Sequence, residues 1–247
     1  LVDVFIRTTG GQTSFAVDGL TVKGVSGDVV VASLPVSQLL NLTTHPGVRS
    51  IQSANVWKTM IDQSVPASNT LQVRNAYNVR GKDIIVGIID TGIDPAQLDF
   101  RSLADDTRSR ILYLWDMSRT DGQPPKGFES AGGTEIDSTF INAKLRVGDL
   151  FFANTDLNGH GTHVSGTAAG NGGGTQFIGM APEADLVVVK ATRGEASGSF
   201  SSADIITALD YIHKTAERLG KPYVINMSLG AVAGPADGSD AESAAID

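Results

Sequence analysis

The sequence predicts an α/β protein in which helices cover both faces of a central parallel sheet. Three runs are expected to be its core strands, namely 84–89, 186–190 and 223–228, and the first of them is almost wholly apolar. Parallel strands that are buried on both faces have this composition, whereas strands with one solvated face alternate apolar and polar residues. A chain of 247 residues is long enough for one large domain of this kind and a small second unit.

The first part of the chain, residues 1–60, is predicted to be a separate α+β domain. Apolar residues at positions 2, 4 and 6 have the two-residue period of a half-buried strand. Further elements are expected in the order of a strand at 28–34, a short helix that has Pro35 in its first turn at 35–42, and a strand at 45–51. Residues 61–247 then form the N-terminal portion of the larger domain, with an insertion at about 100–157.

Within the larger domain, strands and helices are expected to alternate. The predicted elements, in order, are a helix at 67–80, a strand at 110–116, loops at 122–127 and 132–135, a short helix at 140–145 and a long helix at about 202–219. Gly220 and Pro222 follow the long helix, and both residue types end helices. The insertion either shapes a binding cleft or decorates the surface, and the sequence favours neither.

Composition excludes several classes of function. The formal net charge is −8 and no basic patch is visible, so nucleic-acid binding is not expected. No apolar run approaches the roughly 20 residues that span a bilayer, so no membrane segment is expected. The chain has no cysteine, which excludes disulfides and a thiol nucleophile. It begins at Leu1 in a predicted strand without a signal peptide before it, so we expect the gene to start earlier.

The most informative stretch is the glycine-rich run 156–170, which places His160 at the mouth of a predicted helix. Gly159 and Gly161 let the backbone approach a neighbour closely, and the small residues that follow let the helix lie tight against a sheet. An imidazole held rigidly in this way suits proton transfer. Two alternatives stay open: His160 and His163 could ligate zinc from one helical face, or both could be ordinary buried histidines.

Three motifs, in this order along the chain, resemble those of the subtilisin-like serine proteases, or subtilases. They are an apolar strand at 84–94 that ends in Asp-Thr-Gly-Ile-Asp, the run His-Gly-Thr-His-Val-Ser-Gly-Thr at 160–167, and Val-Ile-Asn-Met-Ser-Leu-Gly at 224–230. The resemblance implies a subtilisin-like three-layer fold and peptide-bond hydrolysis by an Asp–His–Ser triad. His160 would be the general base and then the general acid, and Asp90 would orient it. Asp94 is a rival carboxylate, but the family pattern assigns the role to Asp90.

The resemblance also implies a groove for a polypeptide substrate between two walls. One wall corresponds to Ala196, Ser197, Gly198 and Phe200, and the other to Ser228, Leu229 and Gly230. A glycine-rich strand edge accepts an extended peptide as an added strand. In the family, an aromatic residue at the position of Phe200 lines an apolar subsite. An ordinary strand end is the alternative interpretation of the second wall.

A structural calcium ion is a further expectation from the family. Gln63 and Asp99 match side-chain ligands of its calcium site, and Asn171 lies near the position of another. Calcium takes about six to eight oxygens, many of them carbonyl oxygens that a sequence does not reveal. The glycines after Asn171 lack the Lys-Ser/Thr ending of a phosphate loop, so nucleotide binding is not expected.

The N-terminal domain resembles the propeptide domains that precede subtilase catalytic domains. A helix followed by His45-Pro46-Gly47-Val48 and a strand carries this resemblance. The segment 62–66 resembles the start of many mature subtilisins, so cleavage near Ile61–Asp62 is expected. Such a domain is a folding chaperone, an inhibitor or a retained module, and a plain extra subdomain is the alternative. The family resemblance also implies a secreted or extracytoplasmic location.

Half of the expected catalytic machinery is missing from the sequence. Neither the Gly-Thr-Ser motif of the family's nucleophile nor its downstream oxyanion asparagine occurs. Either a C-terminal part of an active protease carries the serine, or the chain is a subtilase-like binding or scaffold module. We favour the first, because three parallel strands with only half of the elements that cover them would expose a broad apolar face. The chain alone is then expected to be inactive, since both the nucleophile and an oxyanion donor are absent.

Overall fold

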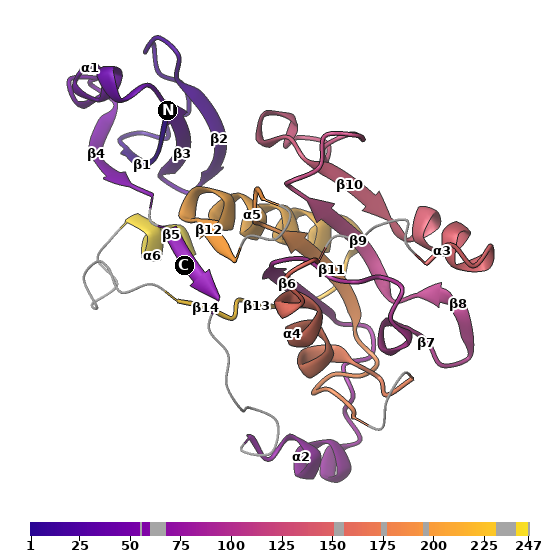
Figure 1. Cartoon of the computed structure of the whole chain (residues 1–247). Coiled ribbons are helices and arrows are strands. Elements are labelled where there is room, and N and C mark those ends of the chain that lie inside the picture. Colours follow the sequence, from indigo (N-terminus) through magenta and orange to yellow (C-terminus); the bar gives the residue numbers. More distant parts are fainter. Residues whose placement is uncertain are drawn as a thin grey trace.

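A five-stranded sheet lies at the centre of the larger part of the chain (Figure 1). The computed structural model describes residues 1–54, 56–59, 68–150, 156–173, 177–194, 198–230 and 241–246. In the order β10-β9-β11-β6-β13, the strands are Thr134–Asp137, Ile111–Asp116, Asp185–Lys190, Ile85–Asp90 and Tyr223–Asn226. All neighbouring strands are parallel except β10, which runs antiparallel to β9. The predicted α/β fold with a central parallel sheet is therefore confirmed.

One prediction about the insertion is wrong. Its glycines predict a loop at 132–135, but β10 begins at Thr134 and pairs with β9. Thr134 and Ile136 are buried, so pairing with a neighbouring strand outweighs the local turn composition. The helix predicted at 140–145 forms as α3 (Ser138–Arg146), and Asp137 caps it by accepting from the Phe140 N–H.

Helices cover both faces of the sheet because successive strand residues point to opposite sides. One cluster of buried residues joins β6 and β11 to α5 (Ser202–Leu219) and includes Ile85, Ile89, Val187 and Val189. A second cluster joins the same strands to α3 and α4 (His160–Ala169) and includes Val86, Ile88, Leu186 and Val188. Figure 1 shows α4 and α5 on opposite sides of the strands. The unbroken apolar runs of the sequence thus supply both layers of the core.

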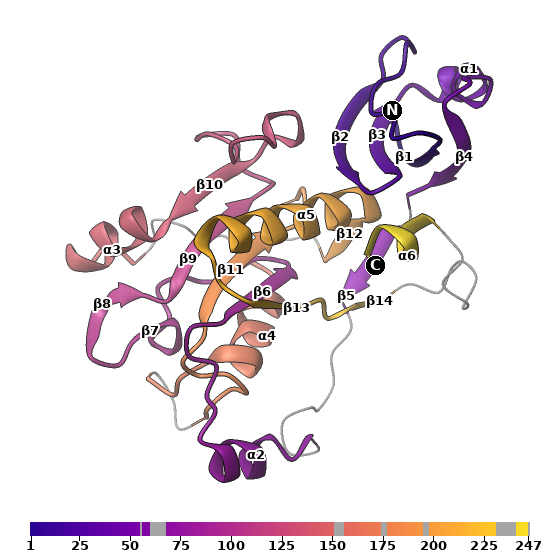
Figure 2. The same cartoon turned by 180° about the vertical axis from the view of Figure 1, so that it is seen from behind.

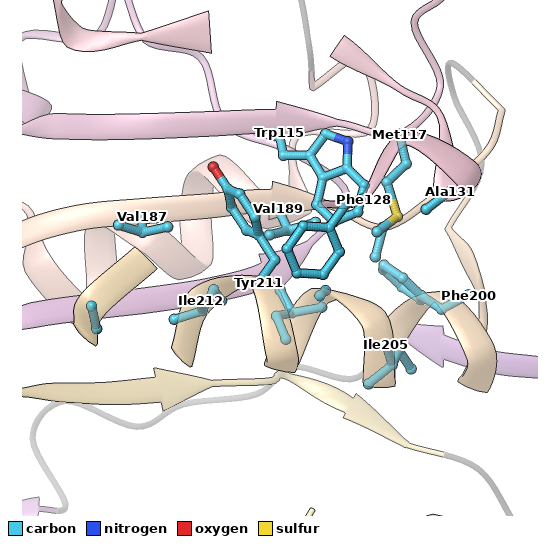
Figure 3. Close-up of a cluster of buried hydrophobic side chains, with 14 of the residues drawn as sticks. Trp115, Met117, Phe128, Ala131, Val187, Val189, Phe200, Ile205, Tyr211 and Ile212 are labelled. Carbon is cyan, nitrogen blue, oxygen red and sulfur yellow. The ribbon is translucent and has the colours of Figure 1, made fainter. Parts of the chain in front are cut away.

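Aromatic side chains fill the cluster between α5 and the sheet (Figure 3). The Tyr211 ring lies 5.0 Å from the Trp115 ring and 5.6 Å from the Phe128 ring, measured between centroids. Tilted and edge-on pairs at this spacing are favourable arrangements of aromatic rings. The Tyr211 hydroxyl also donates to the Glu135 carboxylate at 2.6 Å, which ties α5 to β10. Burial and the Glu135 charge raise the pKa of the Tyr211 phenol, so it stays protonated as a donor.

Residues 1–54 form an antiparallel sheet of their own beside a short helix. In the order β2-β3-β1-β4, its strands are Thr21–Ser26, Val29–Leu34, Val2–Thr8 and Val48–Ser53. A 3₁₀ turn, η1 (Val36–Gln38), leads into α1 (Leu39–Thr43) where a short helix is expected. The strand β2 is not predicted from the sequence, because Lys23 and Gly24 interrupt its apolar pattern and most of its residues are only half-buried.

One face of this small sheet packs against the larger part of the chain. On β1, Val4 and Ile6 point into the unit's own core, whereas Phe5 points toward α5 and α6 (Ala241–Ile246). The contact cluster consists of Phe5, Val29, Val31, Ala203, Ile206, Ala241 and Ala245. The Ser201 hydroxyl also donates to the Asp3 carboxylate across the contact at 3.2 Å. Figure 2 shows the small sheet standing at one end of α5.

Short elements complete the described part. They are α2 (Thr70–Tyr77), η3 (Leu98–Phe100), β7 (Arg101–Ser102), β8 (Asp105–Ser109) and η4 (Glu129–Ala131). The helix α2 lies within the segment predicted to be helical, and its Arg74 donates to the Gly179 carbonyl at 2.6 Å. None of the helices in the described ranges is long and apolar enough to cross a bilayer.

We expect Ile212→Ala to lower the free energy of unfolding by about 2–5 kcal/mol, as truncations in packed cores do. Ile212 is fully buried on the face of α5 that packs on β6, and Gly87 opposite has no side chain to fill the space. Urea denaturation of the chain measures the change. The exposed Val147 gives the control: Val147→Ala should change the free energy by less than about 0.5 kcal/mol. Equal losses in the two variants would contradict this packing.

Candidate active site

Asp90 is the last residue of β6 and is fully buried at the carboxyl edge of the central sheet. Functional groups of open parallel sheets gather at this edge. Its Oδ1 atom accepts a hydrogen bond from the Thr91 N–H at 2.7 Å, which sets the carboxylate relative to the turn that follows. An otherwise apolar strand therefore ends in one buried, oriented carboxylate.

His160 is the first residue of α4, which begins beside the end of β6. Gly159 precedes it with φ of +82°, a conformation that L side chains rarely adopt. Gly161 lies so close to the turn after β6 that a Cβ there would collide with the Gly92 carbonyl oxygen. One glycine thus turns the chain into the helix, and the other lets the helix approach the strand end.

The His160 imidazole and the Asp90 carboxylate form a buried pair. Nδ1 lies 2.7 Å from Oδ1, and the side chains are 13% and 0% exposed. Their other polar atoms, His160 Nε2 and Asp90 Oδ2, are buried and have no hydrogen-bond partner within the described ranges. Because Nδ1 faces a carboxylate, it carries the proton, and the Nε2 lone pair is left to accept one. The pair is therefore arranged as a general base.

Burial raises the pKa of the Asp90 carboxyl above its ordinary value near 3.8. Hydrogen bonds from His160 and from the Thr91 N–H partly offset this rise in pKa, because they favour the ionised form. The nearby Asp156 carboxylate adds to the rise. A carboxylate in such surroundings gains from a neighbouring cation, so it would stabilise a protonated imidazole beside it.

A second group of polar residues holds the start of α4 against the end of β6. The Asp156 carboxylate accepts hydrogen bonds from the Thr91 hydroxyl and from the N–H groups of Gly159 and Thr162. The Thr91 hydroxyl in turn accepts from the Gly161 N–H at 2.9 Å. No role is predicted for Asp156 or Thr91 from the sequence, although an aspartate just before a helix start is a recognisable capping signal.

The linker after the small sheet lies between the two predicted walls of the substrate groove. Its strand β5 (Val56–Thr59) pairs antiparallel with β12 (Ser199–Ser201) on one side and with β14 (Leu229–Gly230) on the other. Phe200 lies opposite Trp57 in this register, and Gly230 lies opposite Lys58. Figure 2 shows β5 running from the small sheet toward β14. A segment of the chain itself thus occupies the place expected for an added peptide strand.

The predicted wall residues lie partly within the described ranges. Gly198 directly precedes β12, and Ser228 directly precedes β14. The Phe200 side chain is 1% exposed and lies in the aromatic cluster under α5, so the apolar subsite expected there stays a prediction (Figure 3). Ala196 and Ser197 lie outside the described residues.

The predicted calcium ligands are also only partly described. Asp99 and Asn171 are neighbours, because the Asn171 N–H donates to the Asp99 carbonyl at 3.1 Å. The Asn171 amide is engaged, with Oδ1 accepting from the Gly173 N–H and Nδ2 donating to the Arg101 carbonyl. Gln63 lies outside the described residues. Calcium takes about six to eight oxygens, so this donor set is incomplete and the calcium site stays a prediction.

The second histidine of the motif, His163, is directed to a different place from His160. It lines a cavity of about 510 Å³ together with Asp99, Thr167 and Phe177. The parts of the chain that the structure describes contain no cluster of three or more histidine, aspartate and glutamate side chains that could hold a metal ion. The zinc interpretation of the two histidines therefore finds no support in this part.

A buried carboxylate–imidazole pair at the carboxyl edge of an α/β sheet is an arrangement found in hydrolases that use a serine nucleophile. The chain belongs to the subtilase family, and the family's model matches residues 81–247. The match includes both members of the pair and the segments on both sides of β5. The prediction of a subtilisin-like serine protease family is therefore confirmed.

Similar proteins are proteases of greater length. The chain is 29% identical over 247 residues to the PII-type proteinase of Lactococcus lactis subsp. cremoris, with 95% of this chain and 12% of that protein covered. It is 32% identical over 162 residues to the major intracellular serine protease of Bacillus subtilis, with 66% and 38% covered. Among solved structures, the Clostridium perfringens CspB protease has a TM-score of 0.62 and 32% identity, with 73% of this chain and 36% of that chain covered. The chain thus spans only a part of each relative.

We expect the Asp90 carboxylate to lower stability at neutral pH. Its pKa is higher in the folded chain than in the unfolded one, so stability is lost as the pH rises from near 3.8 through the raised value. Asp90→Asn removes this charge. The free energy of unfolding of the variant, relative to the wild type, should therefore increase between about pH 3 and about pH 7, as measured by urea titrations.

Asp105 provides a control of opposite sign. It is exposed, and the hydroxyl of Thr107 lowers its pKa, so the wild-type carboxylate gains stability over the same rise in pH. Asp105→Asn should therefore lose stability relative to the wild type. A difference for Asp90→Asn that does not depend on pH would contradict the raised pKa.

Proposed function

We propose that the protein to which this chain belongs is a serine endopeptidase that hydrolyses peptide bonds through an Asp–His–Ser triad. Asp90 and His160 supply two members, and the serine lies in a C-terminal part beyond residue 247. The proposal is carried by His160 Nε2, which is buried without a partner among the described residues while Nδ1 is bound to Asp90. A general base needs such an atom within reach of the proton that it takes.

In the proposed mechanism, His160 takes the serine proton at Nε2 as the hydroxyl oxygen attacks the scissile carbonyl. Asp90 holds the ring in the Nδ1-protonated form and stabilises the imidazolium. His160 then gives this proton to the leaving amine, and a water molecule activated in the same way releases the acyl group. The low exposure of the pair supports this role, because little water screens the attraction between carboxylate and imidazolium.

The two walls of the groove support a polypeptide as the substrate. Both β12 and β14 already pair with an extended segment, so both present main-chain hydrogen-bonding groups to a strand. A peptide held in this way is extended and aligned through its main chain, whatever its side chains. The groove and the pair also lie at the same edge of the sheet, because β14 follows β13 and α4 begins at the end of β6.

The free edge of the central sheet supports a continuation of the fold. In the described part, β13 is the last strand on its side of the sheet. Val224 is 63% exposed and Tyr223 is 38% exposed, whereas the neighbouring strand β6 is buried throughout. Further elements would cover this apolar edge, and in our proposal they bring the serine and the oxyanion donors. The alternative, a binding or scaffold module without a nucleophile, leaves the edge open.

We propose in addition that the N-terminal unit blocks the groove until it is removed. Its sheet is anchored on α5 and α6 by apolar contacts, and its linker strand β5 fills the groove. A substrate strand cannot enter while β5 is paired with both walls. The chain would therefore be an inhibited form of the N-terminal part of the enzyme.

Two expectations from the family stay predictions. A secreted or extracytoplasmic location is implied by the resemblance, while one relative is named an intracellular protease. Calcium held by Asp99 and Asn171 would stabilise the loop after α4, and it has no part in the proposed chemistry.

We expect the full-length protein to react with a fluorophosphonate probe, which modifies activated serines. His160→Ala should abolish labelling, and Asp90→Asn should lower kcat about 10⁴-fold because the imidazole loses its correct tautomer. Asp94→Asn is the matched control, since among the described residues that carboxylate bonds to Ala96 and Gln97 in its own turn. The 247-residue chain alone should not be labelled. Persistent labelling of His160→Ala would contradict the proposed triad. A full-length protein that is not labelled would favour the alternative, a binding or scaffold module.

The proposed block predicts self-cleavage between the small sheet and the catalytic part. N-terminal sequencing of the active full-length protein should find a new N-terminus near Asp62, at a junction that lies outside the described residues. The same junction should stay intact in His160→Ala, because the cleavage uses the protein's own base. An uncut junction in fully active enzyme would contradict the proposed block.

A further inference from the structure

We infer that Asp156 is a positioning residue whose carboxylate joins the start of α4 to the end of β6 and so orients His160 toward Asp90. The inference rests on the proposed function and deepens it, because it concerns how the base is held. No hydrogen bond between Asp156 and the His160 ring occurs in the described part, so Asp156 acts through its neighbours.

Four hydrogen bonds converge on the Asp156 carboxylate. Oδ1 accepts from the Thr91 hydroxyl at 2.7 Å and from the Gly159 N–H at 2.9 Å. Oδ2 accepts from Thr162 twice, from its N–H at 2.7 Å and from its hydroxyl at 2.5 Å. Thr91 directly follows Asp90, while Gly159 directly precedes α4 and Thr162 lies in its first turn. The carboxylate therefore links the two elements that carry the catalytic pair.

The two threonine hydroxyls act as relays to the backbone. The Thr91 hydroxyl accepts from the Gly161 N–H at 2.9 Å while it donates its proton to Asp156. The Thr162 hydroxyl accepts from the Asp94 N–H at 2.9 Å while it also donates to Asp156. A hydroxyl has a single proton, so each relay needs an acceptor at this place. One side chain thus orders the backbone on both sides of the contact.

These bonds also complete the first turn of α4. The first N–H groups of a helix have no partner within the helix. Here the N–H groups of Gly161 and Thr162 bond to Thr91 and Asp156, and the His163 N–H makes a helical bond to the Gly159 carbonyl at 3.1 Å. A negative charge at this end of a helix is favourable as well. The place where α4 starts, and with it His160, is therefore set by Asp156.

An asparagine at this position would not reproduce the arrangement. Each carboxylate oxygen accepts from two donors, so an amide nitrogen at either place would face donors instead of acceptors. At least one pair of hydrogen bonds would be lost, and α4 could shift relative to β6. Since His160 Nδ1 is 2.7 Å from Asp90, a small shift would disturb the pair directly.

The charge of Asp156 acts on the catalytic pair as well. Among the described residues, the Asp156 charge acts on the Asp90 carboxyl at the end of β6, which holds the His160 ring, and residues 151–155 carry no ionisable side chain. The Asp156 carboxylate contributes to the raised pKa of Asp90, less than burial does. A negative charge here favours an extra proton on the pair, so its removal should make that protonation less favourable.

The test compares Asp156→Asn with the wild type in the full-length protein. We expect kcat to fall about 10- to 100-fold while KM changes less than about threefold, because the groove is intact and the base is displaced. The acid limb of the kcat/KM profile should move to lower pH, because a negative charge near the pair is lost. A variant that is only less stable would show neither a fall in kcat with a nearly unchanged KM nor a shift of the acid limb of the kcat/KM profile. Wild-type kcat with an unmoved acid limb would overturn the inference.

Thr91→Val tests whether Asp156 acts through the Thr91 hydroxyl. It also serves as a second variant if Asp156→Asn folds poorly. It removes the relay hydroxyl while it keeps the side-chain shape. If Asp156 acts through Thr91, the losses of kcat in the two single variants should not add in the double variant. Full additivity would overturn this path. Asp94→Asn removes a nearby carboxylate whose hydrogen bonds within the described ranges are local, and it should keep kcat within about twofold.

His160→Ala separates this inference from the proposed function. Activity that survives His160→Ala would show that the triad itself is wrong. If His160→Ala is inactive while Asp156→Asn keeps the wild-type kcat and pH profile, the triad stands and only the positioning role is lost.

Discussion

The burial of the Asp90 carboxylate is the constraint on which the rest of the site depends. The strand that ends in it is apolar and covered on both faces, so the carboxylate needs polar partners from the protein itself. The His160 ring and the Thr91 N–H provide them at Oδ1, so the start of α4 has to lie beside the end of β6. The two glycines beside His160 follow from the same requirement, because Gly159 needs a positive φ and Gly161 has no room for a Cβ.

Two features of the described part bear on the role of this region, namely buried polar atoms without partners and a linker strand between the two predicted groove walls. A buried Nε2 on His160 and a buried Oδ2 on Asp90, both without partners in the described part, are unfavourable for a purely structural cluster. Arrangements that lower stability in this way are expected at functional sites. The linker strand β5 pairs with both segments that are predicted to bind a substrate, so it connects the small N-terminal sheet to the predicted groove. Both features favour a catalytic unit kept from its substrate over a passive scaffold.

Local patterns are enough to predict most of this fold. The apolar run that ends in Asp90 forms β6, and Gly220 marks the end of α5 as expected. Pairing between distant segments is not predictable in this way: β10 begins inside a segment with loop composition, and β5 occupies the groove expected for a substrate. In the site, the family motifs point to Asp90 and His160. They do not reveal Asp156, whose partner Thr91 is 65 residues away along the chain.

Asp90 holds the His160 ring through Nδ1, while Nε2 has no partner among the described residues, and the tautomer of the ring tests this arrangement most directly. Nitrogen-15 NMR of the chain resolves the ring nitrogens of its four histidines, and His160→Gln assigns the resonances. We predict a neutral His160 ring with the proton on Nδ1 and none on Nε2, and loss of this preference in Asp90→Asn. A proton on Nε2, or a ring that does not respond to Asp90→Asn, would contradict the account.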